Sequence, residues 1–220
     1  MIARDLITED IPPLKPNESA LKAVSWMDEF KVSHLPVVNN REFLGIISEP
    51  DLLDLESTSN SINESGVPLI NVFSYDHHHL FEVVKTLSAN NLSLIPVLNQ
   101  KDQYIGSITI AKLMKVLAEM SVVSDSGGIV ELELNVNDYS LAEVAQIVES
   151  NNAKILGSFI TSHPDSTKIQ LTFKTNRVDL GAILQTFNRY NYTVTAVYDQ
   201  GDREEDLKTR FDSFMNYLDL

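Results

Sequence analysis

One motif occurs twice in this chain of 220 residues, and that repeat constrains the fold more than any other feature. The first copy reads LPVV at residues 35–38 and FLGIIS at 43–48, and the second reads IPVL at 95–98 and YIGSIT at 104–109. The prolines lie 60 positions apart (96 − 36) and the glycines 61 (106 − 45), so the copies differ by one residue in a polar loop, where a change of length costs least. A period of about 60 residues predicts that each copy is a small βαββα unit rather than one turn of a solenoid.

An amphipathic helix is expected before the motif in each copy. Its apolar residues recur with the i, i+3, i+4, i+7 spacing of one buried stripe: Ala20, Ala23, Val24 and Met27 in the first copy, and Leu80, Val83, Val84 and Leu87 in the second. The two apolar runs of each motif are separated by turn residues and predict a hairpin of buried strands. A second helix is expected after Ser48, which can cap it, with Pro50 in its first turn.

These features resemble the CBS domain, and two in tandem resemble a CBS pair, or Bateman module. The motif that carries the resemblance is h-P-V-h followed by h-x-G-h-h-[ST]-x-x-D-h-h, which the first copy completes with Asp51-Leu52-Leu53. The resemblance implies two CBS domains, at residues 1–60 and 61–121. It also implies a regulatory ligand with an adenosine group (ATP, ADP, AMP or S-adenosylmethionine) in clefts between the domains, and sensing rather than catalysis.

The residues of the first copy point to the same kind of site on physical grounds. The hydroxyl of Ser48 would lie beside free backbone N–H groups at a helix N-terminus, which favours a phosphate. The carboxylate of Asp51 can accept two hydrogen bonds from ribose hydroxyls. Pro36 and Val37 offer an apolar wall for a purine base. The alternative is that Ser48 only caps the helix and Asp51 only complements its dipole.

The second copy departs from the motif at the position of the ribose-binding carboxylate. Thr109 is retained, but Lys112 replaces the aspartate and cannot accept a hydrogen bond. Lys112 either attracts a phosphate that reaches over from the first-copy site or is an ordinary solvated helix residue. His34 lies where family members often place a polar group near the ligand, and Leu94 offers nothing comparable. The predicted ligand-binding residues are His34, Pro36, Val37, Ser48, Asp51, Pro96, Thr109 and Lys112.

The remainder of the chain follows a different plan. After a small-residue linker at 121–128, residues 130–136 alternate apolar and polar as a strand with one buried face. The segments that follow predict a helix at 141–148, strands at 155–161 and 168–174 around a hairpin at 163–166, a helix at 180–187 and a strand at 193–198. The order βαββαβ predicts a four-stranded antiparallel sheet with both helices on one face, the ferredoxin-like plan, over residues 128–200.

Behind a CBS pair, this order resembles an ACT domain, and the whole chain is similar to CBS–ACT proteins grouped with acetoin-utilisation regulatory proteins. ACT domains that bind amino acids usually have a glycine between the first strand and the first helix, where the backbone approaches the ligand. That turn is Asn137-Asp138-Tyr139-Ser140 here, so the resemblance favours subunit pairing over an amino-acid site. Residues 201–220 predict a separate amphipathic helix.

Composition excludes several classes of function. The net charge of −14 opposes binding to nucleic acid, and no basic run interleaved with aromatic residues counters it. Apolar runs are too short for a membrane span, no signal peptide is recognised and cysteine is absent, so we expect a cytoplasmic protein. Three consecutive histidines at 77–79 cannot all face one ion, so no metal is expected there. The polar stretch 56–66 predicts a flexible linker.

No motif of the chain supports catalysis. Nucleophile elbows, phosphate loops and zinc-binding helices are absent from the sequence. We therefore expect a non-enzymatic regulatory α+β protein: tandem CBS domains fused to an ACT-like domain, working as a homodimer that can regulate a protein partner. The competing interpretation is a ligand-free scaffold that dimerises and docks a partner.

Overall fold

The computed structural model describes residues 1–8, 10–55, 60–162 and 167–199. The chain divides into two compact units, Met1–Leu117 and Ala118–Leu220. Among the helices of these described residues, none is both long and apolar enough to cross a bilayer. The predicted C-terminal helix at 201–220 lies outside the described residues.

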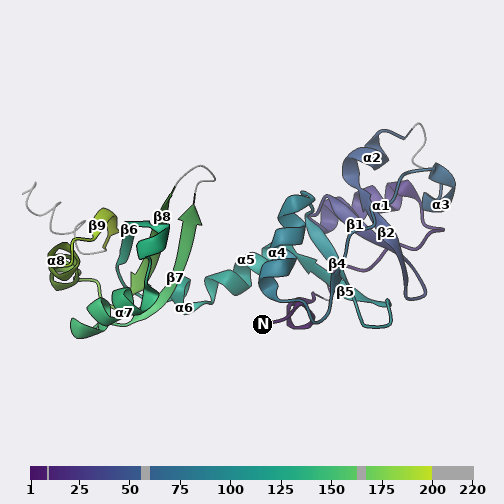
Figure 1. The fold of residues 1–220 in the computed structure, drawn as a ribbon. Helices are drawn as coiled ribbons and strands as arrows, with labels where there is room; N and C mark the ends of the chain where they lie inside the picture. The colour runs from purple at the N-terminus through teal and green to yellow at the C-terminus, as the bar shows by residue number, and fades with distance from the viewer. Residues whose placement is uncertain (9, 56–59, 163–166, 200–220) are drawn as a thin grey trace, which may run out of the picture. The chain divides into compact units, whose positions relative to one another are not determined.

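The first unit contains both copies of the repeat (Figure 1). A short 3-10 helix, η1 (Ala3–Leu6), precedes them. The elements of the first copy are α1 (Ala20–Phe30), β1 (His34–Asn39), β2 (Glu42–Ser48), α2 (Glu49–Leu53) and α3 (Ile62–Ser65). The elements of the second copy are β3 (Ser74–Tyr75), α4 (Leu80–Ala89), β4 (Leu94–Leu98), β5 (Tyr104–Thr109) and α5 (Ile110–Ala118). The predicted helices and hairpins of both copies are confirmed.

The first helix of each copy forms as its apolar spacing predicts. The side chain of Ser19 caps α1 by accepting a hydrogen bond from the backbone of Lys22, and the helix ends at Lys31 in a left-handed conformation. The buried positions of α1 and α4 are equivalent in the repeat: Ala20, Ala23 and Met27 in α1, and Leu80, Val83 and Leu87 in α4. The predicted stripe is confirmed at these six positions, but its other two members are not buried: Val24 is only partly buried and Val84 is 37% exposed.

The two copies are joined by an exchange of segments. The segment before the first copy runs along the second copy, where the backbone of Thr8 donates to Ser107 at 2.9 Å. The segment before the second copy runs along the first, where Ile70 and Ile46 pair. Each copy therefore completes its sheet with chain that precedes the other copy, and neither can form its full set of backbone hydrogen bonds alone.

The motif glycines make this exchange possible. Gly45 and Gly106 have φ values of +148° and +150°, which L side chains rarely adopt. A Cβ added at Gly45 would lie 2.6 Å from the Cβ of Leu69, and one added at Gly106 would lie 2.3 Å from Cγ2 of Ile7. Glycine recurs in the motif because a crossing segment touches the backbone there.

The prediction of a flexible linker at 56–66 is wrong for its described part. Residues 62–65 form the helical turn α3, and Ile62 is only 4% exposed within the core of the first copy. The backbone of Ile62 donates to Glu18, and the backbone of Ala20 donates to Asn60. One apolar side chain and a few backbone hydrogen bonds order this segment, a signal too sparse to read from a polar sequence. Residues 56–59 lie outside the described part of the chain.

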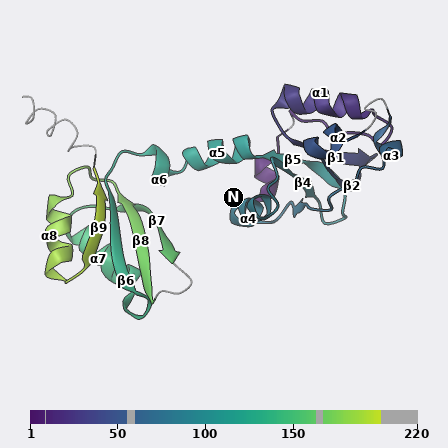
Figure 2. The ribbon, with the colours of Figure 1, turned by 90° about the horizontal axis from the view of Figure 1, so that it is seen from above.

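The second unit has the predicted βαββαβ order. Its main elements are β6 (Ile129–Asn135), α7 (Leu141–Ser150), β7 (Ile155–Ser162), β8 (Lys168–Thr175), α8 (Gly181–Arg189) and β9 (Thr193–Tyr198). The strands lie in the order β7-β8-β6-β9, all antiparallel, which is the ferredoxin-like arrangement (Figure 2). Helices α7 and α8 pack on the sheet face that carries Val130, Leu132 and Phe173. The predicted hairpin turn at 163–166 lies outside the described residues.

The segments that lead into and leave β6 are short helical turns. The predicted linker at 121–128 contains α6 (Ser121–Ser124), whose Val122 packs at Gly157 of β7. The turn after β6 is the 3-10 helix η2 (Val136–Asp138), and Ser140 then caps α7. The linker prediction is therefore corrected: part of this segment belongs to the second unit through the contact of Val122.

A pair of glycine variants tests the exchange of segments. Gly45→Ala should lower the free energy of unfolding by about 3 kcal/mol, because it adds a clash with Leu69 to an unfavourable φ. Gly66 also has a positive φ, of 70°, but a Cβ there meets nothing within 4 Å. Gly66→Ala should therefore cost only about 1–2 kcal/mol. Urea unfolding measures both, and equal losses would show that no segment crosses closely at Gly45.

Candidate functional site

The predicted serine and aspartate of the first copy meet where β2 ends and α2 begins. Ser48 is 7% exposed and caps α2, accepting a hydrogen bond from the backbone of Asp51 at 3.3 Å. Its hydroxyl donates to Oδ2 of Asp51 at 2.5 Å. The second carboxylate oxygen of Asp51 makes no hydrogen bond with a described residue. The cap thus holds the carboxylate at the start of the helix with one oxygen still available.

His34 lies next to this pair because β1 and β2 are paired in register. His34 is opposite Ser48 in the hairpin. The Nδ1 atom of His34 accepts from the backbone of Ser93 at 3.2 Å and lies 3.1 Å from the hydroxyls of Ser33 and Ser93. Because Nδ1 accepts from an N–H group, the ring proton is assigned to Nε2. Burial lowers the pKa of His34, and the carboxylate of Asp51 opposes that shift.

Ser33 and Ser93 are functional candidates that the sequence analysis missed. Ser33 donates its backbone N–H to the hydroxyl of Ser93 at 3.0 Å, so the starts of β1 and β4 are tied together. The two serines lie 60 positions apart (93 − 33), the offset of the repeat itself. The sequence shows that the two serines are at equivalent positions, but it does not show that they meet.

The equivalent corner of the second copy keeps the cap but lacks the carboxylate. The hydroxyl of Thr109 accepts from the backbone of Lys112 at 3.1 Å, as Ser48 does from Asp51. Thr109 lies opposite Leu94 in the β4–β5 hairpin, so the position of His34 holds an apolar side chain. The helix start is therefore preserved without the acidic and imidazole groups of the first copy.

The predicted apolar wall is buried. Val37 is fully buried in the core of the first copy, and Pro36 and Pro96 are buried in their strands. These side chains support the hairpins that carry Ser48 and Thr109. A contact with a purine base remains a prediction for all three.

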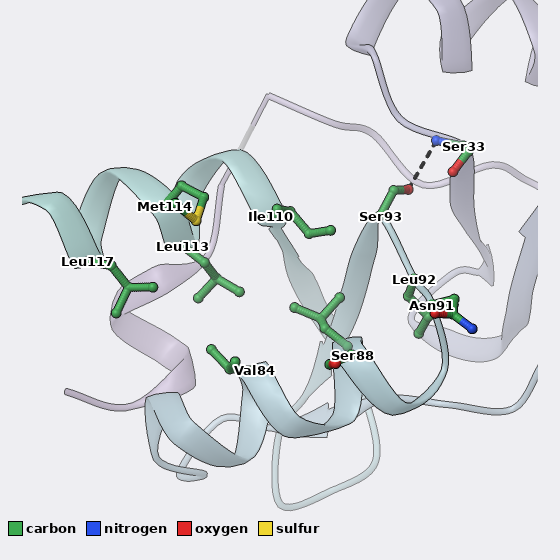
Figure 3. A pocket seen from close by; sticks show the side chains of 11 residues that line it. Ser33, Val84, Ser88, Asn91, Leu92, Ser93, Ile110, Leu113, Met114 and Leu117 are labelled. Carbon is green, nitrogen blue, oxygen red and sulfur yellow. Dashed lines mark hydrogen bonds between the residues drawn. The ribbon is translucent and has the colours of Figure 1, made fainter. Parts of the chain in front are cut away.

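An apolar hollow of 510 Å³ lies between α4 and α5 (Figure 3). Val84 and Leu87 line it from α4, and Ile110, Leu113 and Met114 line it from α5. Ser33 and Ser93 lie at its margin, joined by their hydrogen bond. The hollow therefore reaches the network of His34. Its walls are open, since Ile110 is 47% and Met114 60% exposed.

The three consecutive histidines are used in structural contacts. His79 caps α4 by accepting from the backbone of Phe81, His78 lies 3.2 Å from the hydroxyl of Ser74, and His77 stacks on Tyr75. Among the described residues, no group of three or more histidine, cysteine, aspartate or glutamate side chains is placed to hold a metal ion.

Curated relatives match this chain over its first half. An inosine-5'-monophosphate dehydrogenase of Methanocaldococcus jannaschii is 24% identical over 114 residues, 51% of this chain and 23% of that protein. The enzyme of the same name from Staphylococcus saprophyticus is 30% identical over 118 residues, 52% of this chain and 24% of that protein. The chain thus spans about a quarter of the length of these relatives.

Solved structures match over a similar part of the chain. A CBS domain pair/ACT domain protein from Thermotoga maritima has a TM-score of 0.48 and 18% identity, covering 54% of this chain and 98% of that one. CBSX2, solved in complex with AMP, has a TM-score of 0.48 and 20% identity, covering 55% of this chain and 98% of that one.

A family model matches the part of this chain that contains the repeat. The CBS domain model matches twice, at residues 3–57 and 72–119. The two matches coincide with the two copies of the repeat. Each match includes the motif glycine, Gly45 or Gly106, and the residue that caps the following helix, Ser48 or Thr109. The first half of this chain is therefore a tandem pair of CBS domains.

Proposed function

We propose that the CBS pair binds an adenine nucleotide or another adenosyl ligand, and that the chain is a regulatory sensor without catalytic activity of its own. The observation that carries this proposal is the grouping of buried Ser48 with half-buried Asp51 and His34 at one helix start. It is supported by the family match, because CBS pairs are typically regulatory.

Each group of this corner has a definite chemical capacity. The available oxygen of Asp51 can accept hydrogen bonds from ribose hydroxyls, and Nε2–H of His34 can donate to a phosphate or base acceptor. Burial of the neighbouring Ser48 strengthens such bonds, because competing water is scarce. The corner can thus recognise both hydroxyl and acceptor groups of a nucleoside.

The proposal places one ribose contact in each chain. The corner of Thr109 has Lys112 in place of Asp51 and Leu94 in place of His34. A cation can attract a phosphate but cannot accept from ribose hydroxyls. We therefore propose, more specifically, that the phosphate of a ligand bound at the first-copy site reaches Lys112.

The competing proposal is a ligand-free scaffold that docks a regulated partner. It is favoured by the open apolar hollow between α4 and α5. Thermal unfolding with ATP, ADP, AMP and S-adenosylmethionine separates the two, because a ligand at 100 times its dissociation constant adds about 2.7 kcal/mol to the free energy of unfolding. No shift with any of the four would favour the scaffold.

Replacing the site carboxylate tests the nucleotide proposal directly. Asp51→Ala should weaken binding of the best of the four ligands at least tenfold, about 1.4 kcal/mol, because the ribose loses its acceptor. Lys112→Ala is the matched control, at the same position of the second copy, and should have a smaller effect. Isothermal calorimetry measures both, and equal affinity of the wild type and Asp51→Ala would remove the ligand from this corner.

The imidazole predicts a dependence on pH. Because the folded pKa of His34 lies below its ordinary value of 6.5, the unfolded chain binds more protons between those two values. The contribution of His34 to stability is therefore complete above pH 6.5 and is lost as the pH falls toward the lowered pKa. A proton on Nδ1 also breaks the bond from Ser93.

NMR titration of the His34 ring should give a midpoint below 6.5. Asp51→Asn should lower that midpoint further, because it removes the negative charge that favours the imidazolium form. An unchanged midpoint in the Asp51→Asn variant would indicate that the side chains of His34 and Asp51 lie farther apart than they do in the structure.

We further propose that the chain is a homodimer paired through the helices of its CBS domains. Equivalent positions of the two copies expose large apolar side chains: Leu21 (62%) and Phe81 (67%), and Leu53 (63%) and Met114 (60%). Repetition of the same exposed apolar positions indicates a surface with a common use in both copies.

Met114→Glu should shift the protein toward monomer in sedimentation velocity, because it places a charge in an apolar contact. Lys115→Glu, at an exposed neighbouring position of the same helix, should leave the dimer intact. A dimer that survives Met114→Glu would indicate pairing through the second unit. That outcome would support our proposal that this unit is an ACT-like domain that pairs subunits, consistent with its ferredoxin-like sheet and its glycine-free turn at 137–140.

A further inference from the structure

A second hollow, of 630 Å³, lies between the segment before α1 and the β1–β2 turn. Two cationic side chains line it, Lys15 from the segment and Arg41 from the turn. The amides of Asn17, Asn39 and Asn40 also line it, and Tyr104 of the second copy completes the wall. It shares no residue with the corner of Ser48 and Asp51.

The second copy shows what normally occupies this place. Tyr75 is equivalent to Lys15 at an offset of 60, and Asp102 lies in the turn of the second hairpin, which is one residue longer than the turn that holds Arg41. The hydroxyl of Tyr75 donates to Oδ1 of Asp102 at 2.9 Å, so the segment is bonded to the turn. In the first copy the corresponding segment and turn carry Lys15 and Arg41, which are both cationic and cannot bond to each other.

The second copy also fills the space that the first leaves open. Tyr75 packs against Phe73 at 5.3 Å and stacks on His77 at 5.7 Å between ring centroids. The equivalents of Phe73 and His77 in the first copy are Pro13 and Asn17, which are smaller. The smaller side chains of the first copy therefore help to open the hollow beside Lys15 and Arg41.

The described residues balance the charges of this hollow only in part, since the charge of Lys15 attracts the nearby carboxylate of Glu18. None of the ion pairs between described residues includes Lys15 or Arg41, and no carboxylate lines the hollow. The nearby carboxylate of Glu18 is held by the backbone of Lys15 and by the side chain of Lys22. Two like charges on facing segments repel each other, and an anion between them would reverse that repulsion.

We propose that this hollow binds a small molecule that carries a phosphate group. Guanidinium can hold two phosphate oxygens at once, the ammonium of Lys15 adds a point charge, and the asparagine amides add neutral donors. The volume lies within the range of small-molecule sites and exceeds what one phosphate fills. The overall charge of −14 repels anions from most of the surface. An anion is therefore expected to bind only where cations are grouped, as Lys15 and Arg41 are here.

The site spans both CBS domains. The backbone of Tyr104 donates to the carbonyl of Arg41 at 2.9 Å, and Glu42 forms a bridge with Gln103. The tips of the two hairpins are thus in direct contact beside the hollow. A ligand held by Arg41 therefore acts where the two domains meet.

The test uses the full chain and inorganic pyrophosphate as the probe. In ¹⁵N-NMR titrations, the signals of the Asn39 and Asn40 amides and of Nε of Arg41 should shift and saturate. Lys15→Gln and Arg41→Gln should each weaken binding at least tenfold. Lys101→Gln, in the equivalent turn of the second copy, and Asp51→Ala should leave it unchanged; the latter separates this site from the proposed nucleotide site.

A double variant converts the first copy to the pattern of the second. Lys15→Tyr with Arg41→Asp replaces the two cations with the pair that is bonded in the other copy, and it should abolish pyrophosphate binding while the chain stays folded by circular dichroism. Absence of saturable shifts in the wild type would overturn the proposal. Equal loss of binding in Lys101→Gln and Arg41→Gln would also overturn it, because it would show only general attraction to cations.

Discussion

The fold of the first unit depends on two places where a crossing segment lies close against a motif glycine. At Gly45 and Gly106 the segment that precedes one CBS domain crosses the hairpin of the other, and only a residue without Cβ leaves room at these φ values. Because the crossings are reciprocal, each domain is completed by chain from outside its own repeat. Neither domain can therefore form its full set of backbone hydrogen bonds without the other.

Much of this arrangement could be predicted from the sequence because it is local and periodic. The helices follow the apolar spacing of α1 and α4, the hairpins follow the motif, and Ser48 and Asp51 are close because a cap and its helix are three residues apart. Contacts across the repeat could not be predicted, since a pattern within one copy does not say which residues of the other it meets. The bond between Ser93 and His34 and the burial of Ile62 are of this second kind.

The two copies share a backbone and differ in chemistry at three pairs of positions. Asp51 corresponds to Lys112, Lys15 to Tyr75 and Arg41 to Asp102. The helix cap is kept at Asp51 and Lys112, whereas Arg41 and Asp102 lie in turns that differ in length by one residue. Packing therefore does not demand the change from Asp51 to Lys112, because the same cap accepts either residue. These differences between the copies occur at a helix start and at one hollow. They therefore mark residues that are available for binding rather than needed to maintain the fold.

A ligand can regulate only by binding two arrangements of the protein with different affinity. The network of Ser33, His34 and Ser93 gives the CBS pair a structural basis for such a difference, because it joins the start of β1 to the start of β4 beside Asp51. A nucleoside held by Asp51 and His34 would favour the arrangement in which these strands stay together. Protonation of His34 at Nδ1 would remove the bond from Ser93 and favour their separation. Ligand and proton therefore act on the same contact in opposite directions, so that protonation of His34 should weaken nucleotide binding by the same factor by which bound nucleotide raises the acid dissociation constant of His34.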